Sequence, residues 1–446
     1  MLWFRRVVTG AAVGAAFFML GLNLGHTQVG PQGTSTPSVE INRQLELLGK
    51  ILSIVRSDYV DKPDDGKLLS AAIDGIVKSL DPHSSYMDAK SYRDMQTTTS
   101  GQFGGLGMQV NMDGDGLLKV VSPIDDTPAS RAGIQAGDII TQVDGMPVKG
   151  MTLAQAVEKM RGTPGTQVRL EIKRKDQAEP LNFTLTREVI KVSAVRKQLE
   201  GDDVGYIRIT QFNSRVADEL KEAIQALTAK VPPEQFRGYI LDLRNNPGGL
   251  LDQAVRVAGA FLTSGEIVSI RGRNPDQVQR FTAAPGDLID GKPLIVLING
   301  GSASASEIVA GALQDQSRAT IIGTRTFGKA SVQTIIPLGQ GNGALRLTTA
   351  RYYTPSGRSI QAQGIAPDIE VLQDVPKEVA AVVQRRSEAG LSGHLKAEGD
   401  EQTGSQSFVP RDAKDDKALQ TALALLRGTE TNPAFPAKPK QAASVH

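Results

Sequence analysis

Cysteine is absent from this 446-residue sequence. Its absence excludes disulfide bonds, zinc–thiolate sites, a lipidated N-terminal cysteine and a thiol nucleophile, so any catalysis has to use oxygen or nitrogen groups. Aromatic residues are scarce at 4%, and neither sign of charge predominates, because 50 Lys and Arg residues stand against 48 Asp and Glu residues. Since there is no basic excess to attract a polyphosphate, nucleic acid is not an expected partner.

The N-terminal segment has the layout of an export signal. Arg5 and Arg6 precede a run without charged residues from Val7 to His26. A basic region followed by an apolar one is what export requires, so the protein is expected to leave the cytosol. The run approaches the ~20 residues that cross a bilayer, and no clean Ala-x-Ala cleavage site follows it, so a retained anchor competes with a cleaved signal. We expect cleavage and a periplasmic location, with inner-membrane association if the segment is retained.

Composition divides the chain into five segments. They are a signal peptide or anchor (1–28), a linker and helical region (29–98), a β-rich module (99–188), a region in which strands alternate with helices (189–373) and a helical and polar tail (374–446). The alternation in the fourth segment predicts βαβ units and a mostly parallel sheet. The predicted fold class is therefore mixed α and β.

Periodicity predicts individual elements. A helix is expected around residues 45–55 and another over 68–80, where Asp81-Pro82 ends it because proline denies the preceding residue the helical region. Two helices this short cannot bury a core alone, so we expect them to pack on another domain or on a second copy of the chain. The tail is predicted to hold a helical stretch after Val375 and an amphipathic helix over 417–427. The other predicted strands are 103–110, 117–124, 136–145, 168–174, 181–188, 205–209, 238–244, 293–299, 320–324 and 332–338, and the other predicted helices are 153–160, 214–227, 251–262 and one after Ser304.

Three serines on alternate positions, Ser302, Ser304 and Ser306, stand at a predicted strand-to-helix corner. Only Ser304 has a glutamate three residues later, Glu307, so its simplest interpretation is the first residue of a capping box. The first turn of a helix also offers unpaired N–H groups and the positive end of the helix dipole, which would stabilise an oxyanion. From these residues alone, capping and nucleophilic catalysis both remain open.

A serine nucleophile needs a base to take its proton. His83 is the only histidine outside the export segment, the polar tail and the last position, and a structural role beside Asp81-Pro82 is the simpler interpretation of it. Lysine can replace histidine if burial lowers its pKa from ~10.4 to ~7–8. Lys329 is the candidate, because Phe327 and apolar predicted strands flank it, although most loop lysines are solvated.

Four motifs carry a family resemblance. They are Gly301-Ser-Ala-Ser-Ala-Ser-Glu307, Phe327-Gly-Lys329 with Gln333, Leu243-Arg-Asn-Asn-Pro-Gly-Gly249 and Leu80-Asp-Pro-His-Ser-Ser-Tyr86. Together with a PDZ-like module, this combination resembles the carboxyl-terminal processing proteases, also called tail-specific proteases. The resemblance implies a crotonase-like catalytic core with an inserted PDZ domain and no metal or cofactor.

The same resemblance assigns roles to residues of the site. It implies that Ser304 is the nucleophile, Lys329 the general base and Gln333 the residue that positions the lysine. It also implies an oxyanion hole made of the backbone N–H groups of Ala305 and Gly249. Glycine suits such a turn, since it lets the backbone approach a ligand closely.

The sequence Gly104-Gly-Leu-Gly-Met108, followed by a strand, resembles the carboxylate-binding loop of PDZ domains, and Ser130–Asp138 and Val143–Gly145 resemble later PDZ turns. In such a loop the N–H groups of Gly105, Leu106 and Gly107 would form a nest for a chain-terminal carboxylate, while the peptide pairs as an extra strand. Met108 stands where phenylalanine is commoner. Tight β geometry alone would also explain a lone Gly-Leu-Gly.

Two other motifs and one departure from the family pattern need comment. Asp113-Gly-Asp-Gly resembles a calcium loop, but Ile124 stands at the twelfth position in place of glutamate, so a hairpin turn is expected. Gly339-Gln-Gly-Asn-Gly343 lacks the strand and helix context of a nucleotide loop. The family usually has glycine after the base lysine, where this chain has Ala330. If φ were positive there, the methyl group would cost roughly 1–2 kcal/mol.

The sequence therefore predicts an exported serine endopeptidase that recognises unstructured, apolar C-terminal tails of proteins through its PDZ domain. Cleavage is expected to proceed through a Ser-Lys dyad and an acyl-enzyme. Self-association through the terminal helices is expected, and an adaptor or activator protein is a further candidate partner. A PDZ adaptor on an inactive protease scaffold is the alternative. An acyl-CoA enzyme is a third hypothesis, against which export counts because coenzyme A is cytosolic.

Overall fold

The computed structural model describes residues 37–114, 116–175, 177–274, 276–376 and 387–437. The predicted export segment and most of the helical stretch predicted after Val375 lie outside these ranges. The chain divides into two compact units, one up to Leu68 and one from Leu69 onward. Within the described ranges, no helix is both long enough and apolar enough to cross a bilayer.

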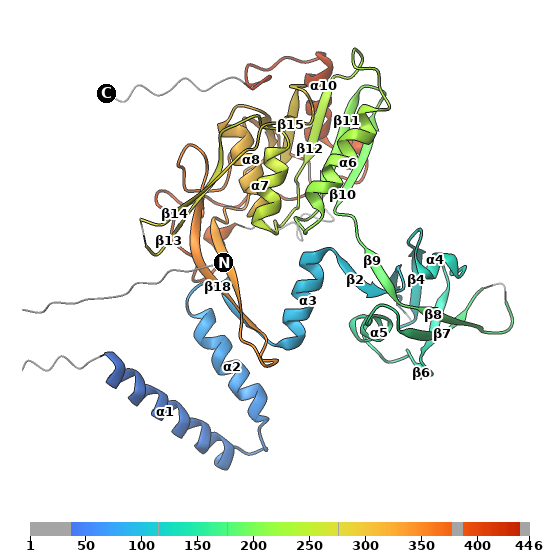
Figure 1. Cartoon of the computed structure of the whole chain (residues 1–446), viewed down its shortest axis with the longest axis vertical. Coiled ribbons are helices and arrows are strands. Elements are labelled where there is room, and N and C mark those ends of the chain that lie inside the picture. The colour runs from blue at the N-terminus through green and yellow to red at the C-terminus, as the bar shows by residue number, and fades with distance from the viewer. Residues whose placement is uncertain (1–36, 115, 176, 275, 377–386, 438–446) are drawn as a thin grey trace, which may run out of the picture. The chain divides into compact units, whose positions relative to one another are not determined.

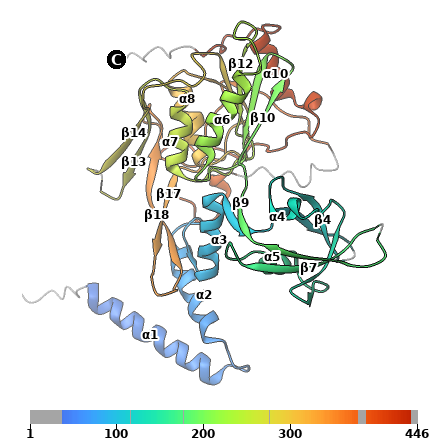
Figure 2. The same ribbon diagram turned by 45° about the vertical axis from the view of Figure 1, so that its right-hand side comes forward.

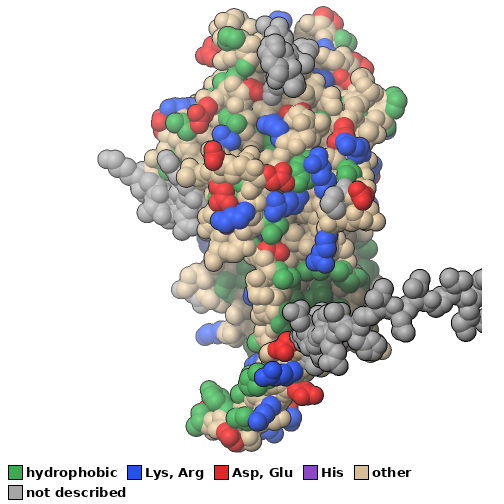
Figure 3. Space-filling view, turned by 90° about the vertical axis from the view of Figure 1, so that its left-hand side faces the viewer, with side chains coloured by type: hydrophobic (Ala, Val, Ile, Leu, Met, Phe, Trp, Pro, Cys, Tyr) green, Lys and Arg blue, Asp and Glu red, His purple; other side chains and the backbone are tan. Residues whose placement is uncertain are grey.

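The first unit is built around α1 (Pro37–Asp58), which contains the helix predicted over 45–55, and it ends inside α2 (Asp65–Lys78). Much of the apolar surface of α1 is not covered. Ile41 and Leu45 are each 59% exposed, and Ile51 and Ile54 are each 48% exposed. The lower part of Figure 3, where α1 comes into view, shows hydrophobic side chains at the surface. This helix therefore does not complete a core within its own unit.

The β-rich module has its own sheet and core (Figure 1). Its elements are β2 (Gln102–Gly105), β3 (Met108–Met112), β4 (Leu118–Pro123), α4 (Pro128–Arg131), β5 (Ile139–Val143), β6 (Met146–Pro147), α5 (Leu153–Met160), β7 (Gln167–Lys173), β8 (Leu181–Thr186) and β9 (Glu188–Lys191). Strands β3, β4, β5, β7 and β8 follow one another in antiparallel order, β6 pairs with β5, and β2 pairs with β9 in a separate ribbon. Alternate residues of β7, among them Leu170 and Ile172, are buried in the core, as the period of a half-buried strand requires.

Of two sequence predictions about this module, one is wrong and the other is confirmed. The single strand predicted over 103–110 is wrong: Gly107, with φ of 76°, breaks it into β2 and β3, which belong to different sheets. The hairpin predicted at Asp113 is confirmed, because β3 and β4 pair in antiparallel fashion on either side of it.

The region after the module forms a six-stranded sheet that is parallel except for its first pair, which confirms the predicted architecture. Its strands, in spatial order, are β10 (Val195–Glu200), β11 (Val204–Ile209), β12 (Gly238–Asp242), β15 (Leu294–Ile298), β16 (Thr320–Gly323) and β19 (Ile369–Glu370). One face packs on α6 (Val216–Thr228), α7 (Leu251–Gly259) and α8 (Ala305–Asp315), and the other packs on α10 (Lys417–Arg427) (Figure 1). A strand that is buried on both faces appears in the sequence as a continuous apolar run, and residues 293–299, which contain β15, are an example.

A second, antiparallel sheet adjoins the first. It contains β1 (Ser85–Met87), β13 (Glu266–Gly272), β14 (Val278–Thr282), β17 (Ser331–Pro337) and β18 (Ala344–Tyr353). Strand β18 pairs with β1, β13 and β17, so it organises this sheet, and Figure 2 shows β17 and β18 side by side. The remaining elements are α3 (Ala89–Ser100), η1 (Glu388–Gly390) and η2 (Ala413–Asp415).

Several elements escaped prediction. Strand β18 mixes arginine and threonine with apolar residues, and α3 has no apolar face to give a helical period. The start of α3 is fixed locally instead, because the Asp88 side chain accepts the N–H of Ser91 at 2.7 Å, and its end is fixed by Gly101 at φ 65°.

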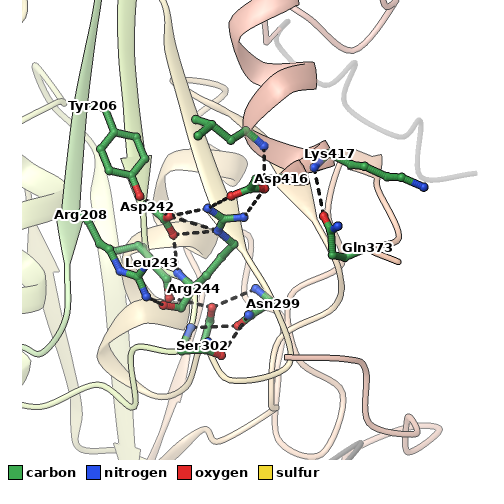
Figure 4. A network of polar contacts seen from close by, with 12 residues as sticks. Tyr206, Arg208, Asp242, Leu243, Arg244, Asn299, Ser302, Gln373, Asp416 and Lys417 are labelled. Carbon is green, nitrogen blue, oxygen red and sulfur yellow. Dashed lines mark hydrogen bonds and ion pairs between the residues drawn. The ribbon is translucent and has the colours of Figure 1, made fainter. Parts of the chain in front are cut away.

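A buried ion-pair network joins the end of β12 to the start of α10 (Figure 4). Arg244 lies 2.7 Å from Asp242 and donates two hydrogen bonds to Asp416, at 2.7 and 2.8 Å. Asp416 also accepts the N–H of Leu419 at 3.1 Å and so caps α10. Because each buried charge needs its partners, this network fixes the C-terminal segment against the loop that follows β12.

Candidate active site

Ser304 lies at the corner between β15 and α8 in a backbone conformation that only a few non-glycine residues adopt, with φ 54° and ψ −113°. Such a conformation costs about 1–3 kcal/mol and is typical of functional sites. The N–H of Ser304 donates to the Glu307 carboxylate at 2.8 Å, which is the glutamate half of the predicted capping box. The Ser304 carbonyl accepts the N–H groups of Glu307 and Ile308.

The two neighbouring serines have structural roles. The Ser302 hydroxyl donates to the Leu243 carbonyl at 2.8 Å, and the Ser306 hydroxyl donates to the Asn246 carbonyl at 3.0 Å. Both residues are fully buried, whereas Ser304 is only partly buried. The outer serines therefore bind the corner to the loop after β12 and leave Ser304 as the accessible hydroxyl of the run.

The Asn-Pro-Gly-Gly loop lies directly against this corner. A Cβ atom on Gly248 would come within 2.8 Å of the Ser304 Cβ and 2.9 Å of the Ala305 nitrogen, so a side chain does not fit. The Gly248 N–H already donates to Asn246 at 2.9 Å. The turn that contains Gly249 thus meets the first residue of α8, Ala305, whose N–H has no carbonyl partner within the helix. The structure thus places Gly248, the neighbour of Gly249, against Ala305, and the pairing of the Gly249 and Ala305 N–H groups stays a prediction.

Glu307 connects Ser304 to the loop of Lys329. Its carboxylate is fully buried and accepts the N–H groups of Lys329 at 2.9 Å and Gly328 at 2.7 Å, in addition to that of Ser304. The Thr326 hydroxyl donates to the same carboxylate at 2.5 Å. Burial raises the pKa of Glu307 to about 7, although these four hydrogen bonds act in the opposite direction.

Tyr352 makes a second connection between Ser304 and Lys329, through their carbonyl groups in place of their N–H groups. Its hydroxyl, on β18, faces the carbonyl oxygens of Ser304, at 3.1 Å, and of Lys329. The N–H of Tyr352 donates to the Ala330 carbonyl at 2.9 Å. Burial raises the pKa of Tyr352 well above its usual value, so the phenol stays a donor. Glu307 and Tyr352 together fix the backbones of the serine and the lysine relative to each other.

The Lys329 amine is in the environment that a lysine base requires. Burial lowers the pKa of Lys329, and the positive charge of Arg346 lowers it further, while Glu388, Glu307 and Asp81 oppose the shift. No hydrogen bond joins the Ser304 hydroxyl to the Lys329 amine in the described part of the chain. Hydrogen bonds of catalytic groups are often long before substrate binds, so the absence of this bond by itself does not remove either residue as a candidate.

Ala330 carries none of the strain that a positive φ would cause. It is buried and does not lie in the left-handed region, and Gly328, with φ 95°, takes the special conformation of this loop.

Gln333 lies on β17, at a bulge in the pairing with β18. Its amide nitrogen donates to the hydroxyls of Ser331 at 2.9 Å and Thr348 at 3.1 Å, so it does not contact Lys329 here. Thr348 in turn donates to Asp81 at 3.1 Å, and the N–H of Thr348 donates to the Ser84 hydroxyl at 3.0 Å. The Asp81-Pro-His-Ser84 motif therefore contacts the antiparallel sheet through Thr348, which lies on β18.

His83 has the structural role that was the simpler interpretation of the sequence. Its Nε2 lies 2.8 Å from the Glu388 carboxylate, and its backbone N–H donates to Asp81 at 2.9 Å. The imidazole pairs with Glu388 and not with Ser304.

The PDZ loop joins β2 to β3. Leu106 is buried in the core of the module, and the Gly107 carbonyl accepts the Ile124 N–H at 2.8 Å and the Thr127 hydroxyl at 2.9 Å. Gly105 ends β2, and Met108 begins β3 and packs against the module core. Strand β3 is the last strand of its sheet, so its outer side can accept an added strand.

Metal binding has no obvious site in the ranges that the structure describes, because no group of three or more His, Asp and Glu side chains there could hold an ion.

Comparisons with known proteins place these features in a family. Residues 203–371 match peptidase family S41, residues 119–174 match a PDZ domain, and residues 12–91 match the activating protease CtpB N-terminal domain. The chain is 54% identical over 429 residues to a carboxy-terminal-processing protease of Bartonella bacilliformis, with 95% of this chain and 98% of that protein covered. This chain belongs to the carboxy-terminal processing proteases of peptidase family S41.

Two further relatives share a smaller fraction of identical residues. The carboxy-terminal processing protease CtpA of Bacillus subtilis is 37% identical over 366 residues, with 82% of this chain and 76% of that protein covered. Among solved structures, a photosystem II D1 C-terminal processing protease is 30% identical and covers 71% of this chain and 85% of its own, with a TM-score of 0.42. Family membership makes the chain a serine-type processing protease with a PDZ domain and confirms the predicted mixed α and β fold.

Two residues that join the serine to the lysine were not predicted for that role. Glu307 was recognised only as a capping residue, although the apolar run after it could have indicated its burial. Tyr352 has no local signal, because its contacts with Ser304 and Lys329 span 48 and 23 residues.

The Tyr352 hydroxyl provides a test of this arrangement. Tyr352→Phe removes one oxygen, so kcat should fall about tenfold with little change in KM, the loss expected for one buried hydrogen bond of roughly 1.4 kcal/mol. Tyr353→Phe is the matched control, since that hydroxyl donates to Glu398 at 2.5 Å. Steady-state kinetics with equal losses in both variants would contradict the role assigned to Tyr352.

Proposed function

We propose that this protein is an exported serine endopeptidase that binds the C-terminal tails of proteins through its PDZ domain and cleaves them with a Ser304–Lys329 dyad. The observation that carries the dyad is the Glu307 carboxylate, which holds the N–H groups of both residues, at 2.8 and 2.9 Å. The buried outer serines support Ser304 as the nucleophile, and the lowered pKa of Lys329 supports the lysine as its base.

In the proposed reaction, the Ser304 oxygen attacks the peptide carbonyl while Lys329 Nζ accepts the hydroxyl proton. The N–H groups of Ala305 and Gly249 stabilise the negative oxygen that forms. When the C–N bond breaks, Lys329 returns the proton to the leaving amine. Water then attacks the acyl-enzyme, Lys329 takes its proton, and the serine oxygen regains a proton as it leaves. Gln333 would reach Lys329 only after its hydrogen bonds to the Ser331 and Thr348 hydroxyls break.

Ser304→Ala and Lys329→Met should each lower kcat at least about a thousandfold on an unfolded protein with an apolar C-terminal tail. The cut positions mapped for the wild-type enzyme should be absent from digests with either variant. If the wild-type protein binds such a tail without cutting it, the adaptor alternative is correct.

Stability separates a lysine base from a structural lysine. Because the folded-state pKa of Lys329 is lowered, its charge destabilises the fold fully below the folded pKa, and this cost disappears as pH rises to the unfolded value. Lys329→Met should therefore leave the melting temperature at neutral pH unchanged or raise it. Lys292→Met is the contrasting control, because Lys292 donates to the carbonyls of Pro233 at 2.9 Å and Phe236 at 3.1 Å and should lower the melting temperature without loss of cleavage. A large fall in the melting temperature of Lys329→Met would mean that Lys329 is a structural lysine.

Recognition of a free C-terminus by the PDZ domain is supported by the loop Gly105–Met108 and by the open edge of β3. A substrate whose C-terminal carboxylate is amidated should show a KM at least about tenfold higher, since a charge-assisted contact is worth roughly 1.5–3 kcal/mol. Acetylation of the substrate N-terminus is the matched control and should change nothing. Equal kinetics for the amidated and free substrates would mean that the PDZ domain does not read the carboxylate.

Self-association is the second part of the proposal, supported by the uncovered apolar side chains of α1. Light scattering should show a smaller species for Leu45→Glu than for wild type, because a charge placed at an apolar contact prevents burial. Asn42→Glu, at another exposed position on the same helix, is the control. An unchanged mass for Leu45→Glu would exclude this helix face from the contact. Export to the periplasm is supported by the basic and apolar N-terminal segment alone.

A further inference from the structure

A fully buried glutamate, Glu388, lies close to the loop of Lys329. It begins η1, and its side chain is 0% exposed. Its backbone N–H donates at 3.0 Å to the carbonyl of Phe327, two residues before Lys329. Burial of a carboxylate is costly unless its oxygens are paired, so the partners of Glu388 show what it holds in place.

The two oxygens of Glu388 bind different segments. One oxygen lies 2.8 Å from His83 Nε2, although these residues are 305 positions apart in the chain. The other accepts the side-chain amide of Gln361 at 3.0 Å. The oxygen of the same Gln361 side chain accepts the N–H of Ala330 at 3.0 Å. A continuous path of hydrogen bonds therefore runs from Glu388 to the peptide group directly after Lys329.

The charged groups around the Lys329 amine come from several segments. Arg346 of β18 lowers the pKa of Lys329, while Glu388 of η1, Glu307 of α8 and Asp81 raise it. His83 adjoins the site through its pair with Glu388, and its backbone carbonyl accepts the Arg346 Nε at 3.0 Å. The Tyr352 hydroxyl, which contacts the Lys329 carbonyl, completes the titratable groups.

We propose that Glu388 is a positioning residue for Lys329, acting on the lysine backbone through Gln361 and on the lysine amine through its negative charge. This inference rests on the proposed function, because it takes Lys329 as the base. It makes the C-terminal segment a working part of the active site. The same segment supplies Asp416, which binds Arg244 beside the Asn-Pro-Gly-Gly loop.

A positioning role through charge has a consequence that a purely structural role lacks. Without the negative charge of Glu388, the protonated lysine loses a favourable interaction and gives up its proton at lower pH. The acidic limb of the pH profile of kcat/KM reports the pKa of this base in the free enzyme. Removal of a structural side chain would lower the amount of active enzyme without moving that limb.

The test compares pH profiles of full-length variants. Glu388→Gln keeps the size of the side chain and should move the acidic limb to lower pH by roughly one unit. Glu388→Asp keeps the charge and should leave the limb closer to that of wild type. Arg346→Gln should move it to higher pH, because the positive charge of Arg346 lowers the pKa of Lys329. Glu401→Gln is the matched control: Glu401 forms the other His–Glu pair of this segment, 3.0 Å from His394, and its loss should not move the limb.

A second measurement does not depend on cleavage. In a Ser304→Ala background, the rate at which the Lys329 amine reacts with an amine-directed reagent can be followed across pH by peptide mass spectrometry. Glu388→Gln should shift this titration in the same direction as the limb. If Glu388→Gln does not fold, Glu388→Asp and Arg346→Gln decide: an Arg346→Gln titration that coincides with wild type would overturn the charge argument.

The outcomes separate this inference from the proposed function. Cleavage that survives Lys329→Met would refute the dyad itself. An inactive Lys329→Met together with a folded Glu388→Gln whose limb and amine titration match wild type would refute the role of Glu388 alone.

Discussion

The Glu307 carboxylate accepts the N–H groups of both Ser304 and Lys329, and the rest of the site depends on this shared contact. It acts on the main chain, so the relation between the serine and the lysine does not rely on flexible side-chain torsions. Tyr352 repeats the connection at the carbonyl groups of the same two residues. These contacts fix the two backbones without engaging the Ser304 hydroxyl or the Lys329 amine.

This arrangement uses conformations and burial that are unfavourable in isolation. Ser304 has a positive φ, and Glu307 is a fully buried acid whose pKa is raised to about 7. Hydrogen bonding reduces the cost of burying Glu307 without cancelling it, since its carboxylate accepts from four donors and its pKa is still raised. Strain of this kind persists only where the surroundings determine it strongly, which is common at catalytic centres.

Distant parts of the chain meet around this centre. Asp81 and His83 come from the segment before β1, Gln361 and Tyr352 from the second half of the core, and Glu388 and Asp416 from the C-terminal segment. Each contributes a buried or partly buried polar group that is paired with another segment. The candidate site therefore depends on several segments of the second unit rather than on one loop.

The sequence by itself determined the parallel sheet, the serine corner and the lysine loop, because apolar periodicity and short glycine motifs are local properties. Motifs with fixed spacing also identified Ser304, Lys329 and Gly249 as candidate site residues. Its residues alone left capping and catalysis open for Ser304, and the family resemblance favoured catalysis, but neither indicated where Ser302 and Ser306 send their hydroxyls. Only the tertiary structure decided where those hydroxyls point and which contacts Glu307, Tyr352 and Glu388 make, because buried polar groups choose partners by distance in space, and no local pattern encodes a contact 305 residues away.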